Sequence, residues 1–285
     1  MRWSDGRKSE NVEDRRGISV PRGVMGGGIG TIILVLAALY FGVDPSVILN
    51  QGTTREGSVP PGSVSRERPA EENRMAEFVS VVLADTEDTW HEIFRRGGKA
   101  YREPKLVLFS DAVDSACGFA QSAMGPFYCP QDSKVYIDLQ FYRDLKSRFH
   151  APGEFAQAYV IAHEVGHHVQ NLMGTSARVH SMQQGADKVT ANNLSVKLEL
   201  QADCFAGIWA YHADRSRKIV EAGDIEAALR AASSLGDDRI QKQSQGRVVP
   251  ESFTHGSSEQ RVRWFKRGIE TGDYAQCNTF KTGSL

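Results

Sequence analysis

Residues 159–174 hold three of the chain's eight histidines. His163 and His167 are four residues apart, so on an α-helix their side chains leave from one face. Apolar residues recur at three- and four-residue steps through the segment, and Gly174 stands where a helix C-cap is expected. The pattern therefore predicts a helix that presents two imidazoles in the same direction.

The residue after the first of these histidines gives the helix a chemical interpretation. Glu164 completes the pattern H-E-x-x-H, in which two imidazoles bind Zn²⁺ and the glutamate is the general base. His168 lies about 100° around the helix from His167, which favours a supporting or surface role over metal binding. The alternative is a half-buried helix with scattered histidines.

A catalytic zinc needs three protein ligands and one open position, so this motif is incomplete. The pattern HExxHxxGxxH is excluded, because Gln170 and Met173 occupy its glycine and third histidine positions. A second predicted helix, residues 195–213, carries Glu199 and Asp203 four residues apart on one face. Alone, these two carboxylates could simply belong to a solvent-exposed face of the helix. Beside HExxH, one carboxylate can supply the third ligand and the other can accept the N–H of a ligand histidine.

Small residues follow this carboxylate pair along the same predicted helix. Ala206, Gly207 and Ala210 lie one to two turns further on. Residues without bulky side chains let helix backbones come close. We therefore expect this helix to approach the HExxH helix closely through these three positions.

An uncharged run of 20 residues, 24–43, has about the length that spans a bilayer. Three arginines precede it closely, whereas no basic residue follows until Arg55. The positive-inside rule then predicts residues 1–23 in the cytoplasm and residues 44–285 on the far side. A cleaved signal peptide is the alternative, but the run is longer than a usual signal core and lacks a good cleavage site.

The remaining chain divides by composition. Residues 44–70 are rich in Pro, Gly and Ser and are predicted to be a flexible linker, followed by one globular domain at 71–285. The 34 basic and 35 acidic residues nearly balance, which argues against a nucleic-acid partner. Nothing in the composition predicts the oligomeric state.

An even number of cysteines follows the apolar run, in a predicted compartment where disulfides persist. They are Cys117, Cys129, Cys204 and Cys277. Of the three pairings, we favour one bond that joins the first two and closes a short loop. The other bond would then join the last two and fix the C-terminal tail to a helix. A thiolate zinc site is disfavoured because no C-x-x-C spacing exists.

Other secondary structure is predicted from local patterns. Residues 105–109 and 134–139 have strand composition, and residues 130–133 read as the turn of a hairpin. Residues 71–96 are amphipathic and predict a helix. Ser257 and Gln260 form a capping box that begins a C-terminal helix.

Together these motifs resemble the gluzincin metallopeptidases, in which HExxH is followed by E-x-x-A-D on a second helix. More closely, residues 104–280 resemble the putative neutral zinc metallopeptidases of bacteria, which one N-terminal helix anchors. The shared stretches are CGFA, GPFYCP, AHEVGHHVQ, LELQAD and FTHG. The resemblance implies that His163, His167 and Glu199 bind zinc and that Asp203 supports a ligand histidine.

Two further stretches extend the resemblance. Residues 125–141 resemble a β-hairpin whose first strand, with Phe127 and Tyr128, receives the substrate backbone as an edge strand. Residues 252–268 resemble a C-terminal segment in which a histidine precedes a helix that carries an arginine. That segment implies His255 as a hydrogen-bond donor to the transition state.

Two other residues receive expectations that the motifs alone do not decide. Arg261 is expected to be a structural partner or a partner of a substrate carboxylate. Tyr211 is a candidate for a second group that stabilises the oxyanion.

The predicted fold is α+β: a zincin-like metallopeptidase domain with a helical bundle and a short, partly antiparallel sheet, preceded by one transmembrane helix. The predicted activity is hydrolysis of a peptide bond in a peptide or protein substrate, with one Zn²⁺ per chain. We expect the protein at the bacterial cytoplasmic (inner) membrane, anchored through residues 24–43, with the catalytic domain outside the cytoplasm. The physiological substrate and its cleavage specificity cannot be predicted.

Two other functions remain open. One is a catalytically silent, zinc-stabilised module that binds a partner protein, although every catalytic position is filled. The other is a zinc hydrolase of a non-peptide amide, such as a cell-wall bond. The hairpin edge favours an extended peptide, because added strands bind through main-chain hydrogen bonds.

Overall fold

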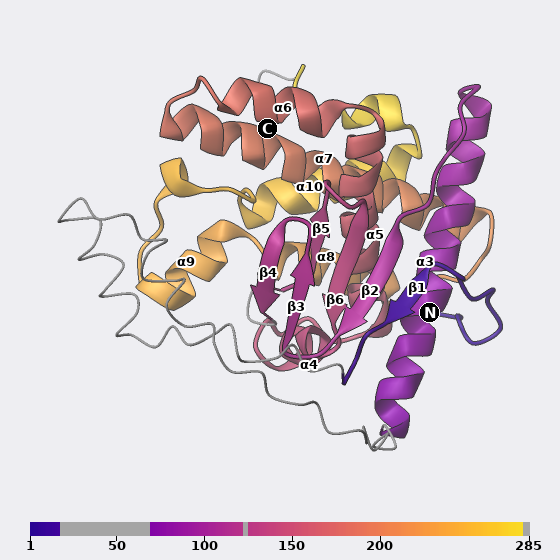
Figure 1. Cartoon of the computed structure of the whole chain (residues 1–285). Helices are drawn as coiled ribbons and strands as arrows, with labels where there is room; N and C mark the ends of the chain where they lie inside the picture. Colours follow the sequence, from indigo (N-terminus) through magenta and orange to yellow (C-terminus); the bar gives the residue numbers. More distant parts are fainter. Residues whose placement is uncertain (18–68, 122–124, 282–285) are drawn as a thin grey trace, which may run out of the picture. The chain divides into compact units, whose positions relative to one another are not determined.

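The computed structural model describes residues 1–17, 69–121 and 125–281 (Figure 1). The predicted span at residues 24–43 and nearly all of the predicted linker at 44–70 lie outside the described residues. Among the residues that the structure describes, none of the helices combines the length and the apolar character needed to cross a membrane.

Residues 1–17 belong to the same compact unit as the chain from residue 69 onward. Within it, β1 (Val12–Asp14) pairs in parallel with β2 (Lys105–Phe109). Trp3 is buried against α3 (Ala70–Arg96). The domain therefore includes N-terminal residues that we expected in a separate segment. Local patterning gives no signal for β1, because it is three residues long and its partner lies far along the chain.

The main sheet is mixed, with strand order β1-β2-β6-β5. β6 (Lys134–Asp138) is parallel to β2, whereas β5 (Phe127–Cys129) is antiparallel to β6 and forms the predicted hairpin with it. β5 is an edge strand of this sheet. A separate antiparallel pair consists of β3 (Ala112–Ser115) and β4 (Gly118–Gln121).

The other described helices lie behind the sheet and beyond its edges in the view of Figure 1. They are α4 (Gln140–Ser147), α5 (Glu154–Leu172), α6 (Thr175–Gln183), α7 (Lys188–Arg215), α8 (Asp224–Ser234), α9 (Asp237–Gln245) and α10 (Ser258–Thr271). The capping box that begins α10 forms as predicted. The fold is thus mixed α+β, mostly helical with a small sheet.

Alternate residues of β2 enter two different cores, as the period of a strand requires. Leu106 and Leu108 belong to the large core with the helices, whereas Val107 and Phe109 belong to a smaller cluster with residues of β3, β4 and β5. The β3–β4 pair therefore covers the sheet face opposite the large core. This arrangement places β5 between the large core on one face of the sheet and the smaller cluster on the other.

The HExxH helix α5 is buried along most of its length and packs on α7. Their close contact is at Gly166, where a Cβ atom would lie 3.0 Å from the carbonyl oxygen of Ala202. The expectation that Ala206, Gly207 and Ala210 make this contact is wrong for Gly207. A Cβ at Gly207 would lie 2.1 Å from a backbone oxygen of α10, so this glycine serves the α7–α10 contact instead.

Candidate metal centre and substrate cleft

The structure brings His163, His167 and Glu199 together where α5 and α7 pack. The two histidine Nε2 atoms are 3.2 Å apart, and the Glu199 carboxylate oxygens lie 3.2 Å and 3.4 Å from them. Ligand atoms at the corners of a zinc tetrahedron with bonds of about 2.0–2.1 Å are separated by about 3.3 Å. The spacing of the three donors therefore fits a zinc ion.

The outer ring nitrogens of both histidines are held by acceptors. His163 Nδ1 lies 2.9 Å from Asp203 Oδ1, and His167 Nδ1 lies 2.9 Å from Gln170 Oε1. Gln170 donates its own amide to the Leu198 carbonyl at 2.7 Å, which turns its oxygen toward the histidine. In the neutral imidazoles each Nδ1 therefore carries the hydrogen, and the two Nε2 lone pairs face each other. Facing lone pairs at this distance are stabilised by a cation between them, either a proton or a metal ion.

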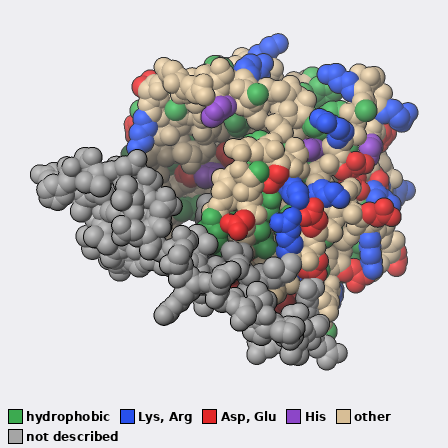
Figure 2. All heavy atoms as spheres, in the orientation of Figure 1, with side chains coloured by type: hydrophobic (Ala, Val, Ile, Leu, Met, Phe, Trp, Pro, Cys, Tyr) green, Lys and Arg blue, Asp and Glu red, His purple; other side chains and the backbone are tan. Residues whose placement is uncertain are grey.

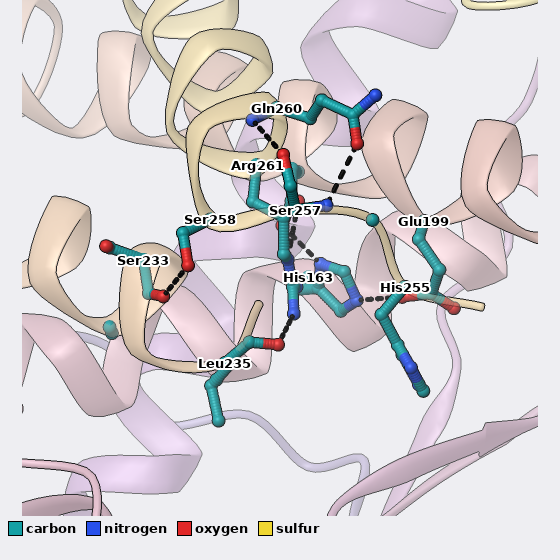
Figure 3. Close-up of polar contacts among 12 residues, drawn as sticks. His163, Glu199, Ser233, Leu235, His255, Ser257, Ser258, Gln260 and Arg261 are labelled. Carbon is teal, nitrogen blue, oxygen red and sulfur yellow. Dashed lines mark hydrogen bonds and ion pairs between the residues drawn. The ribbon is translucent and has the colours of Figure 1, made fainter. Parts of the chain in front are cut away.

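Asp203 is fully buried and accepts hydrogen bonds from three side chains. Besides His163, Arg261 donates from Nε at 2.9 Å and from Nη2 at 3.0 Å, and the Tyr159 hydroxyl donates as well. Figure 3 shows Arg261 and His163 close to each other, with Glu199 on the other side of the imidazole. Arg261 is only 4% exposed, so of the two predicted roles the structure supports the structural one.

The charges of this site compensate one another. Burial alone would raise the pKa of Glu199, but His167 and His163 hold that pKa well below its usual range. Burial alone would lower the pKa of His163, but Asp203 and Glu199 raise it to about 10. The site therefore binds protons strongly in the absence of metal. Metal ligands must be deprotonated, so zinc would displace these protons.

Glu164 lies in the same cleft but outside the group of three donors. It is 8% exposed, and burial raises its pKa. A carboxyl group with a raised pKa both takes and returns a proton more readily near neutral pH. Glu164 is thus close to the candidate ligands without being one of them, and its role as general base stays a prediction.

A cleft of about 680 Å³ opens over these residues. Phe127 and Tyr128 of β5 line it, together with His255 from the loop before α10. That β5 receives the substrate stays a prediction. His180 of α6 also lines the cleft but is not among the three donors. Figure 2 shows histidine side chains in a hollow of the surface.

His255 is positioned by Asp237, a residue without a predicted role. Asp237 Oδ2 accepts the backbone N–H groups of Thr254, His255 and Gly256 at 2.7–3.1 Å, and Oδ1 lies 3.3 Å from His255 Nδ1. The His255 side chain is 53% exposed. The hydrogen bond to Asp237 raises the pKa of His255, which favours an imidazole that can donate into the cleft.

The expectation for Tyr211 is wrong. It lies on α7 about 18 Å along the axis from Glu199, at 1.5 Å per residue. It is not among the residues that line the cleft. Its ring lies under the guanidinium of Arg215, with 4.7 Å from that group to the ring centroid.

Both favoured disulfides are present. Cys117–Cys129 joins the β3–β4 turn to β5, and Cys204–Cys277 joins α7 to the C-terminal region. No cysteine remains free. The sulfur atoms are therefore not available as metal ligands.

Three residues that shape this site are missed by the sequence motifs. Tyr159 and Asp237 act through hydrogen bonds to groups that only the fold brings near. Gln170 contacts His167, three residues earlier on α5, and that spacing is a local signal that can identify it.

The mixed sheet, the two packed helices and the three-donor group are consistent with a zincin-like metallopeptidase domain. Residues 1–280 match the family described as putative neutral zinc metallopeptidase. The chain belongs to this family.

Similar proteins cover nearly the whole chain. Uncharacterized protein YpfJ of Escherichia coli (strain K12) is 51% identical, across 98% of this chain and 99% of its own length. Uncharacterized protein Rv2575 of Mycobacterium tuberculosis (strain H37Rv) is 41% identical, across 87% of this chain and 86% of its own length. No solved structure matches the chain.

Proposed function

We propose that this protein hydrolyses peptide bonds with one zinc ion held by His163, His167 and Glu199. The observation that carries the proposal is the pair of Nε2 atoms 3.2 Å apart, with the oxygens of one carboxylate at similar distances from them. The family supports zinc-dependent hydrolysis. The cleft beside an edge strand supports a peptide substrate, because an extended chain can add to β5 through main-chain hydrogen bonds.

The side chains divide the chemistry among them. When bound, zinc would supply a Lewis acid that polarises a carbonyl group and acidifies water. Glu164 takes the proton of the attacking water and returns it to the leaving amine. His255 donates a hydrogen bond to the oxygen on which negative charge develops. Asp203 and Gln170 hold the two imidazoles in the tautomer and orientation that the ligand role needs.

We further propose that the domain works outside the cytoplasm. Two disulfides support this location, because such bonds persist in oxidising compartments. Anchorage through residues 24–43 remains a prediction from their apolar composition.

The test compares Glu164→Gln with Glu154→Gln, a control on the same helix that pairs with Arg74. Glu164→Gln should keep about one zinc per chain and lose hydrolysis of a peptide library by about 10²–10⁴-fold or more. The control should keep both. Cleavage by Glu164→Gln at the wild-type rate would refute the mechanism.

The same experiment addresses the two other functions. A zinc-loaded wild type that cleaves no peptide, yet binds a partner protein, would favour the silent binding module. Cleavage of cell-wall amides without cleavage of peptides would favour the non-peptide hydrolase.

A further inference from the structure

We propose that His168, the histidine directly after the HExxH motif, is a positioning residue for substrate: it holds Tyr128 and thereby fixes β5 relative to the metal ligands. This inference rests on the proposed function, because β5 is the strand to which an extended peptide would add. It gives a role to the third histidine of residues 159–174, which the candidate metal site does not use.

The hydrogen bonds of His168 define its tautomer. Its ring is 1% exposed, and Nε2 lies 2.6 Å from the carbonyl oxygen of Arg102. A carbonyl only accepts, so this nitrogen carries the hydrogen. Nδ1 lies 3.0 Å from the Tyr128 hydroxyl. In the neutral ring Nδ1 is an acceptor, so the tyrosine donates to it.

The Tyr128 hydroxyl is fixed from a second direction by the same helix. Asn171, three residues after His168 on α5, donates from Nδ2 to this hydroxyl at 3.0 Å. The rings of Tyr128 and His168 meet edge to face, with centroids 5.5 Å apart. Tyr128 is thus bound to α5 through both its hydroxyl and its ring.

The short length of β5 explains why such anchors matter. It has three residues and pairs with β6. Phe127 stacks on Tyr136 with centroids 4.8 Å apart, and Cys129 is bonded to Cys117. Tyr128 alone of the three has its side chain hydrogen-bonded to α5.

The helix that Tyr128 contacts is the one that carries two zinc ligands. The His167 side chain points toward the other two candidate ligands. The His168 side chain, about 100° further round the helix, points toward Tyr128. Helix α5 therefore holds in place both the two histidine ligands and the strand that would align the scissile peptide. Loss of the Tyr128 anchor would therefore weaken the binding of an added peptide strand and leave the candidate ligands in place.

Three variants separate the two hydrogen bonds of His168. Tyr128→Phe removes the hydroxyl and keeps the ring. His168→Asn can keep an acceptor near the Nδ1 position for Tyr128, whereas His168→Gln can keep a donor near the Nε2 position for Arg102. If the bond to Tyr128 matters, His168→Gln should behave like Tyr128→Phe, and His168→Asn should remain close to the wild type.

The expected signature is a rise in KM of about 2- to 10-fold, the contribution of one hydrogen bond, in Tyr128→Phe and His168→Gln. The kcat should change little, because the lost interaction is uniform binding, and zinc content should stay at the wild-type level. The KM of the double variant Tyr128→Phe/His168→Gln should be no higher than that of Tyr128→Phe, because His168 acts through the Tyr128 hydroxyl. Backbone amides of β5 should exchange hydrogen faster in the same variants.

Several results would overturn the proposal. An unchanged KM and unchanged exchange at β5 in His168→Gln would show that His168 does not position the strand. Loss of zinc in that variant would assign His168 to the metal site instead, and additive effects in the double variant would show independent roles. Hydrogen exchange needs no substrate, so a wild type that cleaves nothing would refute the proposed function while exchange still decides whether His168 fixes β5.

Discussion

Replacement of Asp203 by Asn separates the support of the metal site from the metal site itself. The substitution keeps the size of the side chain, removes its charge and turns one acceptor oxygen into a donor. Arg261, Tyr159 and His163 all point donors at this carboxylate. Arg261 is 4% exposed, so its guanidinium would become a buried and unpaired charge.

The expected cost follows from that buried charge. Removal of one partner of a buried ion pair destabilises a protein by about 3–5 kcal/mol, a large share of the roughly 5–15 kcal/mol that holds a domain folded. Zinc affinity should also fall, by about 10–100-fold, because the supporting acceptor of a ligand histidine is altered.

Glu199→Gln should show the opposite pattern. Glu199 contacts both ligand histidines but makes no ion pair with a buried arginine. Most zinc should therefore be lost, because one of three protein ligands is gone, whereas the metal-free protein should lose less stability than Asp203→Asn. Asp88→Asn is the control, since this aspartate is half-exposed and pairs with a half-exposed Arg7.

Two measurements decide this prediction. Denaturant unfolding of each protein after a chelator has removed the metal gives the free energy of unfolding. Competition with a chromophoric chelator gives the zinc affinity. Asp88→Asn should lie within about 0.5 kcal/mol of the wild type. An Asp203→Asn protein as stable as the wild type would refute the structural reasoning. Complete zinc loss in Asp203→Asn with zinc retained in Glu199→Gln would reverse the two roles.

Three further predictions concern other parts of the domain. Asp237 raises the pKa of His255, so the protonated imidazole persists to higher pH in the wild type. Asp237→Asn should therefore move the alkaline limb of the pH profile of kcat/KM to lower pH. An unchanged limb would argue against protonated His255 as the hydrogen-bond donor. In Gly207→Ala the new Cβ would lie 2.1 Å from a backbone oxygen of α10, and such overpacking destabilises a protein by about 1–3 kcal/mol. Calorimetry should therefore show a lower Tm than for the wild type, and an unchanged Tm would contradict the close contact of α7 with α10. Lys8 Nζ and a Glu77 carboxylate oxygen are 2.5 Å apart and exposed, so carbodiimide should join them in membranes from cells that make the protein. Mass spectrometry should find this cross-link in the wild type and not in Lys8→Ala; its absence in both would mean that the N-terminal residues are not docked there.

Sequence reasoning succeeded where the chemistry is local. The candidate metal-binding histidines lie four residues apart on one helix, and so do Glu199 and Asp203 on another, so helical periodicity alone aligns each pair. The hairpin of β5 and β6 likewise depends on neighbouring residues and its turn.

The remaining features depend on contacts between distant segments. Asp203 meets Arg261 across 58 residues, and no local pattern in either helix predicts that contact. Gly207 shows a subtler limit: its small size correctly predicts a close helix contact, but helical periodicity does not say which helix approaches. Strand β1 is the extreme case, because three residues pair with a strand more than ninety positions away.

The pairing of β1 with β2 carries a topological consequence. Arg16 Nη1 donates to the carbonyl oxygen of Glu72 at 2.9 Å, so the chain leaves the domain and re-enters it at neighbouring points. The described residues on either side of that stretch, which end at 17 and resume at 69, belong to one folded unit, so they share one aqueous compartment whenever the four-stranded sheet is complete. A single membrane crossing between them would put β1 and β2 on opposite faces of the bilayer. The sheet and an N-terminus on the cytoplasmic side of an exported domain therefore exclude each other in one molecule.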